Sequence, residues 1–340
     1  MVVPEPLTVV YKQINGSTIT TDIYLPPAKD EVTHYPVLIN IHGGAFILGH
    51  SKLVSFAQIQ DCLSRGWIVV CPNHRLCPGV NLKDGPLADT RDFLSWVYAS
   101  NGGLDSVLEN FDAENGKGTR YRVDKDRVMA LGTSSGGFLA LGLGYDTPRP
   151  PAAILNFYGA VHFAHPCWKQ PITPIKSILP AAGFEPGFLE TVYHQDPVPT
   201  TSGISLEGES NPPPGRGGGR NKPDFTNPRD AFAMTQIANG TVLDAIYPAE
   251  QGDILTLDPV TRIDANFPPT FIVHGDADRM VSVEVSRKLY EVLQEKGVNC
   301  GMVEVPGEDH TFTLGMEVGS HAWNHSVKGF EWLENVISKK

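Results

Sequence analysis

The 340-residue chain has little cysteine, no long apolar run and no basic stretch. No 18 consecutive residues are apolar, so we expect no membrane-spanning helix. The five cysteines are odd in number and form no C-x-x-C pair, which predicts free thiols in a reducing compartment rather than a disulfide framework. The first residues lack the basic and apolar regions of a signal peptide. Together these absences predict a soluble, cytoplasmic protein, in which the glycosylation sequons at Asn15, Asn239 and Asn324 are chance matches.

Other features that the sequence lacks argue against nucleic-acid, nucleotide-cofactor and metal binding. With 27 basic against 38 acidic residues, the net charge is −11, and no Lys/Arg run provides the cationic surface that nucleic acid requires. Neither a G-x-G-x-x-G fingerprint nor a P-loop is present, so we expect no cofactor. His162, His165 and Cys167 lie close together, but no second ligand cluster accompanies them, so we expect no metal site. These three residues are better placed to line a pocket or the base of a cap.

Buried strands alternate with amphipathic helices along the chain. Apolar runs without alternation are typical of strands buried on both faces, and they occupy residues 35–41, 67–72, 127–131, 153–157 and 269–273. Helical periodicity follows at residues 86–100, 282–297 and 321–338. Residues 7–13 and 18–25 flank Asn15-Gly16, a strong hairpin signal. The pattern predicts an α/β fold: a mostly parallel central sheet with an antiparallel N-terminal hairpin and helices on both faces.

The length alone favours two domains, but the strand pattern favours one α/β domain with an insertion. Residues 1–160 and 268–340 form the predicted α/β domain. Residues 161–267 lack strand signals and form a predicted cap, inserted between the sixth and seventh principal strands. Within it, residues 230–238 have helical character, and the Gly- and Pro-rich residues 201–222 are expected to be a disordered loop.

The strongest motif is Gly132-Thr133-Ser134-Ser135-Gly136-Gly137, which follows a predicted strand and precedes an apolar helix. This context is what a G-x-S-x-G nucleophile elbow requires, because the glycines allow a sharp turn with the serine at its apex. The serine then lies at a helix N-terminus, where the positive end of the helix dipole favours an oxyanion. The alternative is a glycine-rich turn that only turns or binds a phosphate.

A second glycine motif, His42-Gly43-Gly44-Ala45-Phe46, directly follows the predicted strand at residues 37–41. A tetrahedral intermediate needs backbone N–H donors directed at its oxygen, and consecutive glycines at a strand end can supply them. The alternative is a tight turn with a structural His42. Its occurrence together with a nucleophile elbow favours the oxyanion interpretation.

These two motifs and the Asn73-His74-Arg75-Leu76-Cys77-Pro78 segment resemble the hormone-sensitive-lipase-like branch of the α/β-hydrolases. The resemblance covers most of the chain outside about residues 165–265. It implies an α/β-hydrolase fold, a Ser/Asp/His triad, an oxyanion hole from the His-Gly-Gly loop and carboxylester hydrolysis without a cofactor. The chain departs from the family pattern at Thr133 (usually Asp), at Ser135 and Cys77 (usually Ala), and in lacking the longer N-terminal cap helices.

The acid and the base are expected downstream of Ser134, in the order Ser, acid, His. Asp278 lies in the loop after the strand at residues 271–273, where the family carries its acid, and Asp276 is the rival. His310 lies in a later loop and matches the family's G-x-x-H-x-F pattern. Of the other late histidines, His321 and His325 are expected on the surface of the last helix, and His274 at the sheet edge.

The predicted mechanism is acyl transfer. Ser134 attacks a carbonyl, His310 takes its proton, Asp278 orients His310, and amides stabilise the oxyanion. The amides expected in the oxyanion hole are those of Gly43, Gly44 and Ser135, and the expected substrate-binding residues are Phe46, Thr133 and His165. The predicted partner is a small-molecule ester or acyl substrate, with a homodimer left open. Two alternatives stay open: a biosynthetic enzyme that releases, transfers or cyclises an acyl chain or performs C–C chemistry, and a non-catalytic small-molecule receptor.

Overall fold

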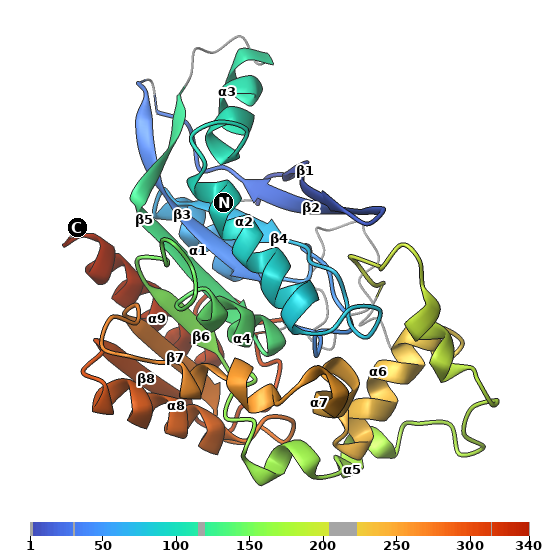
Figure 1. The fold of residues 1–340 in the computed structure, drawn as a ribbon. Helices are drawn as coiled ribbons and strands as arrows, with labels where there is room; N and C mark the ends of the chain where they lie inside the picture. Colours follow the sequence, from blue (N-terminus) through green and yellow to red (C-terminus); the bar gives the residue numbers. More distant parts are fainter. Residues whose placement is uncertain (1–2, 30, 115–119, 204–222, 314, 340) are drawn as a thin grey trace.

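The computed structural model describes residues 3–29, 31–114, 120–203, 223–313 and 315–339. Residues 204–222 of the expected disordered loop lie outside the described residues. Within these ranges, one eight-stranded sheet has the order β1-β2-β4-β3-β5-β6-β7-β8 (Figure 1). Its strands are β1 (Leu7–Ile14), β2 (Ser17–Tyr24), β3 (Thr33–Ile41), β4 (Ile68–Pro72), β5 (Tyr121–Thr133), β6 (Ile154–Phe157), β7 (Thr270–Gly275) and β8 (Cys300–Val305).

The sheet is parallel from β4 to β8, and the β1–β2 hairpin joins it antiparallel at one edge. Helices cover both faces, each over its own apolar cluster. One cluster includes side chains of α2 (Ala88–Tyr98), α3 (Leu104–Glu114), α4 (Ser135–Gly142) and α8 (Val283–Glu295), and the other those of α1 (Phe56–Ser64) and α9 (His321–Ile337). The predicted mostly parallel sheet with helices on both faces is confirmed.

The segment between β6 and β7 contains short helices: α5 (Thr173–Lys176), α6 (Pro228–Asn239) and α7 (Val242–Ile246). They lie together beside the sheet (Figure 1), and α6 contacts both others. The buried Arg229 of α6 donates to the carbonyls of Ile47 (3.0 Å) and Cys77 (2.6 Å). Burial lowers the pKa of Arg229 to about 10. This side chain therefore ties α6 to the loops that follow β3 and β4.

No helix within the described ranges is both long and apolar enough to cross a membrane.

A buried ion-pair network joins β1, the loop after β4 and the start of α2. The Asp89 carboxylate is fully buried and accepts from the backbone amide, Nε (both 2.9 Å) and Nη2 (2.8 Å) of Arg75, and from Lys12 Nζ (2.6 Å). Burial opposes the ionisation of Asp89, but these hydrogen bonds outweigh it and hold the pKa of the carboxyl below its ordinary value. Asp89 therefore stabilises the fold above its unfolded pKa of about 4, and this stabilisation is lost as the pH falls through its lower folded value.

We expect Asp89→Asn to lower the free energy of unfolding by about 3–5 kcal/mol, because it leaves the buried Arg75 without its counter-ion. Urea denaturation at pH 7 measures this change. The control is Asp92→Asn, since Asp92 pairs with Lys12 at an exposed position, where about 1 kcal/mol or less is expected. Equal losses in the two variants would contradict the role given to Asp89.

Candidate active site

Ser134 stands at a strained turn between β5 and α4. Its backbone has φ 52° and ψ −121°, a conformation that L-residues rarely adopt. The neighbouring glycines are required by close packing. A Cβ on Gly132 would lie 2.0 Å from the carbonyl oxygen of Gly136, and one on Gly136 would lie 2.2 Å from the carbonyl oxygen of Ile41. The sequence thus folds into a tight strand–turn–helix with the serine at its apex.

The structure brings Ser134, His310 and Asp278 together from three separate segments. His310 Nε2 lies 3.0 Å from Ser134 Oγ, and His310 Nδ1 lies 2.6 Å from Asp278 Oδ2. The side chains of His310 and Asp278 are almost completely buried. Asp276, the rival acid, has a different partner: its Oδ1 accepts from the backbone amide of Gly307 at 2.7 Å. The geometry is that of a serine, a base and an orienting acid in a chain of hydrogen bonds.

Asp278 is held as an anion by the groups around it. Its Oδ1 accepts from the backbone amides of Met280 and Val281, both at 2.8 Å. Burial opposes ionisation, but the interactions with His310 and with His274 outweigh it and keep the pKa of Asp278 well below its ordinary value. The carboxylate can therefore accept from His310 Nδ1, which leaves Nε2 as the acceptor toward the serine.

His274 was expected at the sheet edge, and that expectation is wrong. It lies on β7, between β6 and β8, and is fully buried. Its Nε2 is 3.1 Å from Asp278 Oδ2 and 2.9 Å from the carbonyl oxygen of Val281, while Nδ1 is 2.7 Å from Ser286 Oγ. Two acceptors face Nε2, so this atom carries a proton and donates. The sequence carries no signal for the contact of His274 with Asp278, because nothing in the spacing indicates that α8 supplies Ser286 to hold the ring.

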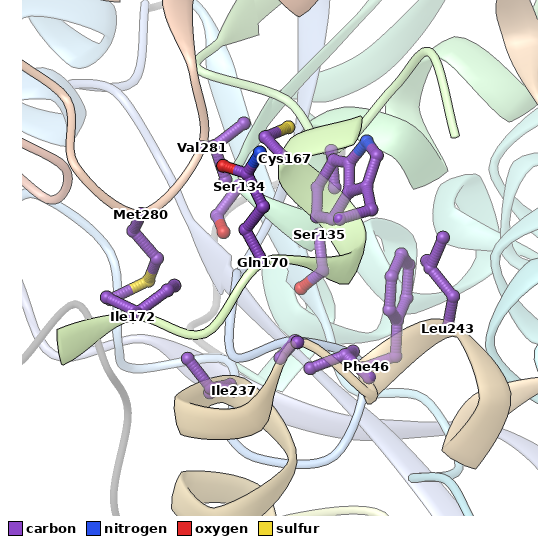
Figure 2. A pocket seen from close by; sticks show the side chains of 15 residues that line it. Phe46, Ser134, Ser135, Cys167, Gln170, Ile172, Ile237, Leu243, Met280 and Val281 are labelled. Atoms are coloured by element: carbon purple, nitrogen blue, oxygen red, sulfur yellow. The ribbon is translucent and has the colours of Figure 1, made fainter. Parts of the chain in front are cut away.

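A mainly apolar pocket opens beside Ser134 (Figure 2). Its volume is about 560 Å³, including the part open to solvent. Its apolar wall contains Phe46, as expected, together with Trp168, Ile172, Ile237, Val242, Leu243, Met280 and Val281. Thr133 and His165, expected to bind substrate, are not among the residues that line it. Thr133 is buried as the last residue of β5, and His165 Nδ1 accepts from the amide of Cys167 to cap a short 3₁₀ turn.

The glycine loop after β3 lines the pocket with Ala45. Ser135 lines it as well, whereas Gly43 and Gly44, whose amides are expected in the oxyanion hole, are buried and are not among the lining residues. Gly44 has φ 113°, and a Cβ there would lie 2.3 Å from the carbonyl oxygen of Leu48, so the loop needs glycine to fold back on itself. Ala45 follows with φ 55°. Ala45 directly follows the two glycines of the His42–Phe46 motif, and this place in the motif is the sequence signal that could have indicated it.

A second hollow adjoins His310 on the other side of the site. It is lined by Pro174, Ile175, Arg279, Asp309, His310 and Thr311, and it shares Ile172 and Met280 with the first pocket. Ser134 and Ser135 line the first pocket and His310 lines the second. The site is therefore two-sided, with Ile172 and Met280 between the halves.

Among the residues described, no three His, Cys, Asp or Glu side chains are placed to hold a metal ion.

Comparison with known proteins gives three kinds of likeness. A family model described as BD-FAE matches residues 21–109 and 224–293. Two curated relatives are non-reducing polyketide synthases, of Preussia isomera (29% identical) and Acremonium egyptiacum (28% identical); each match covers 96% of this chain. The chain spans about one seventh of the length of these relatives, 14% and 15% respectively.

Solved structures share the fold at low identity. An esterase of Thermogutta terrifontis in a propionate-bound structure has TM-score 0.57 at 18% identity, covering 98% of this chain and 95% of its own. A truncated carbohydrate esterase from gut microbiota has TM-score 0.58 at 17% identity, covering 99% and 98%. A Staphylococcus aureus protein of unknown function has TM-score 0.63 at 16% identity, covering 97% and 99%.

The chain thus has the α/β-hydrolase fold of these esterases, and the BD-FAE family model matches two segments of it. The BD-FAE match and the esterase neighbours support the resemblance to the hormone-sensitive-lipase-like, carboxylesterase branch.

Proposed function

We propose that the protein is a serine hydrolase that cleaves a carboxylic ester through an acyl-enzyme. The observation that carries this proposal is the unbroken chain of hydrogen bonds from Ser134 through His310 to the buried anion Asp278. His310 takes the proton of Ser134 as Oγ attacks the substrate carbonyl, and Asp278 stabilises the imidazolium that forms. Water then repeats the sequence on the acyl-enzyme and releases the acid.

The backbone supplies the electrostatic part of the proposed mechanism. The amide of Ser135 is at the first position of α4, where no intrahelical acceptor exists for it. Ala45 lines the same pocket. We assign the oxyanion to these two amides, with Gly44 immediately behind them. Donors fixed in a water-poor site stabilise a developing negative charge far more than mobile water does.

The two hollows suggest where the substrate halves go. His310 must deliver its proton to the leaving oxygen, so the alcohol half belongs in the hollow that His310 lines. The acyl half then belongs in the apolar pocket beside Ser134 and Ser135. The wall of that pocket favours an uncharged acyl group, because burying a charge there without a partner is costly.

A second candidate function is supported by the polyketide synthase relatives. On this proposal the same serine accepts an acyl chain from a biosynthetic thioester and releases, transfers or cyclises it. Both proposals form an acyl-enzyme on Ser134, and they differ in the acyl donor, an oxygen ester or a thioester, and in the acceptor that ends the reaction.

A panel of esters and thioesters tests both proposals. The wild-type protein is assayed with p-nitrophenyl esters from acetate to octanoate, and with thioesters of the same acids on a small thiol. Hydrolysis of the oxygen esters with a preferred chain length supports the esterase. Turnover of thioesters alone, with acyl transfer to an added alcohol, supports the biosynthetic enzyme, and inactivity on every member contradicts both.

The pH dependence is expected to show one ionisation on its acid side. Protonated His310 cannot accept the proton of Ser134. We therefore expect kcat/KM to fall tenfold for each pH unit below the pKa of this ionisation. Asp278 adds no second ionisation near pH 4, because its pKa is held well below the ordinary carboxyl value. A profile of kcat/KM from pH 4 to 9 measures this slope. A limiting slope of two would show that a second essential group titrates there.

His274 is expected to act as a positioning residue for Asp278. In His274→Leu, Asp278 Oδ2 loses one of its two donors, so more of its charge acts on His310. The acid limb of kcat/KM should then move to higher pH by about one unit. His274→Gln can keep an N–H near the position of Nε2 and should leave the limb close to that of the wild type. A limb that stays in place in both variants would reduce His274 to a packing role.

A further inference from the structure

The side chain of Ser135 has no role in the mechanism proposed above, which uses only its backbone amide. Its hydroxyl is buried, with the residue 1% exposed, and has no hydrogen-bond partner among the described residues. Ser135 lines the acyl pocket, and Figure 2 shows its hydroxyl directed toward the side where Phe46 and Ile237 lie. A buried hydroxyl without a partner destabilises the protein, and alanine, the usual residue of the resembled family here, would avoid that cost.

The surrounding wall does not supply the missing partner. The Trp168 indole N–H is already donated to the carbonyls of Val161 and His162, both at 3.1 Å. Phe46, Ile237 and Leu243 contribute only carbon to the wall. Apart from the nucleophile Ser134, the lining side chains with a polar atom that can face a ligand are Gln170 and Cys167, and Gln170 is exposed rather than buried. An oxygen atom on a bound acyl group would satisfy Ser135 without disturbing any hydrogen bond of the protein.

We infer that Ser135 is a specificity-determining residue whose hydroxyl pairs with an oxygen on the acyl half of the substrate, close to the reacting carbonyl. The substrate class is then an ester of an oxygen-substituted acid, such as an alkoxy-, hydroxy- or keto-acid, rather than of a plain fatty acid. This inference rests on the proposed function, because it uses the apolar pocket as the acyl site. The position of this substrate oxygen follows from the sequence. Ser135 directly follows the nucleophile Ser134, so its hydroxyl reaches the first carbons of the acyl group.

Matched substrates isolate this contact. Methoxyacetate and butanoate have the same chain length, with an ether oxygen replacing one CH₂, and 3-methoxypropanoate and pentanoate form a second pair with the oxygen one position further out. For each pair of p-nitrophenyl esters, the ratio of kcat/KM values (oxygenated over plain) is measured in the wild type, Ser135→Ala and Ser135→Cys. Intrinsic reactivity cancels when the ratios are compared between proteins. Cysteine keeps the shape of the serine side chain, with a larger S–H group in place of the O–H, but donates weakly.

We expect the ratio for at least one pair to fall about tenfold in Ser135→Ala, the effect of one hydrogen bond, and to fall in Ser135→Cys as well. A ratio unchanged in Ser135→Ala for both pairs would overturn the inference. A ratio that falls in Gln170→Ala instead would also overturn it, by giving the recognition to Gln170. A ratio kept in Ser135→Cys but lost in Ser135→Ala would show that a heavy atom on Cβ, and not a hydroxyl donor, sets the ratio, and it would likewise count against the inference.

Binding without turnover separates this inference from the proposed function. In a Ser134→Ala background, the dissociation constants of the four matched ethyl esters are measured by isothermal titration calorimetry. Tighter binding of an oxygenated ester that is lost when Ser135→Ala is added supports the inference, even if the wild type hydrolyses nothing. Equal affinities within each pair would overturn it, even if the wild type is an active esterase.

Discussion

Replacing Ser134 with alanine is expected to lower kcat for the best p-nitrophenyl ester by a factor of roughly 10⁶, because the nucleophile that forms the acyl-enzyme is lost. The remaining reaction would proceed by direct attack of water, aided only by the oxyanion donors and by binding. Substrate affinity should change little, since the small Oγ contributes little to a pocket wall made mostly of apolar side chains. A stopped assay with high enzyme concentration measures the residual rate.

The control for this variant is Ser326→Ala. Ser326 is also a fully buried serine, but it lies on α9, in the layer on the other face of the sheet. Its loss should leave kcat within about twofold of the wild type, as expected for a substitution away from the site. If Ser134→Ala keeps more than a hundredth of the wild-type rate while Ser326→Ala behaves as expected, Ser134 is not the nucleophile.

The second large effect is expected for Asp278→Asn, with kcat falling by about 10⁴-fold. Each oxygen of Asp278 faces N–H donors: two backbone amides at Oδ1, and His310 with His274 at Oδ2. An asparagine must direct its own NH₂ at one of these donor pairs, whichever way its amide is turned. When the NH₂ faces His310, that ring takes the tautomer with the proton on Nε2, and it can no longer accept from Ser134.

Asp276→Asn decides between the two candidate acids. Asp276 accepts only the Gly307 amide among the interactions described for its carboxylate, so its replacement should cost less than about tenfold in kcat. Circular dichroism and urea unfolding of both variants establish that each is folded. A larger loss in Asp276→Asn than in Asp278→Asn would reverse the assignment of the acid.

Local sequence patterns predicted the sheet and the turn that carries Ser134. The buried strands were visible as apolar runs, and the glycines around Ser134 indicated a turn that only residues without a Cβ allow. The start of β5 was missed because residues 121–126 alternate between polar and apolar side chains instead of forming an apolar run. Helix α1 was missed because its segment is short and mixed in polarity.

What local patterns could not predict depends on contacts between distant segments. The link between His274 and Ser286 joins β7 to α8, and neither residue carries a motif. Thr133 and His165 were expected to bind substrate from their closeness in sequence to the site, but Thr133 is the buried end of β5, His165 caps a local turn, and neither lines the pocket beside Ser134. Placing Ala45 in the pocket wall required knowing how the loop after β3 folds back at Gly44. Sequence closeness to a motif therefore did not substitute for the direction of the side chain.

The central claim is that Ser134 is a nucleophile activated by His310, and a phosphonate p-nitrophenyl ester tests it most directly. Attack by the serine releases p-nitrophenolate and leaves a stable phosphonyl group on Oγ. We predict release of one equivalent of p-nitrophenolate per protein chain, with the single modification mapped by mass spectrometry to Ser134, and a strongly slowed reaction in His310→Ala. An enzyme that still hydrolyses esters but carries no modification, or carries it on another residue, would contradict the account.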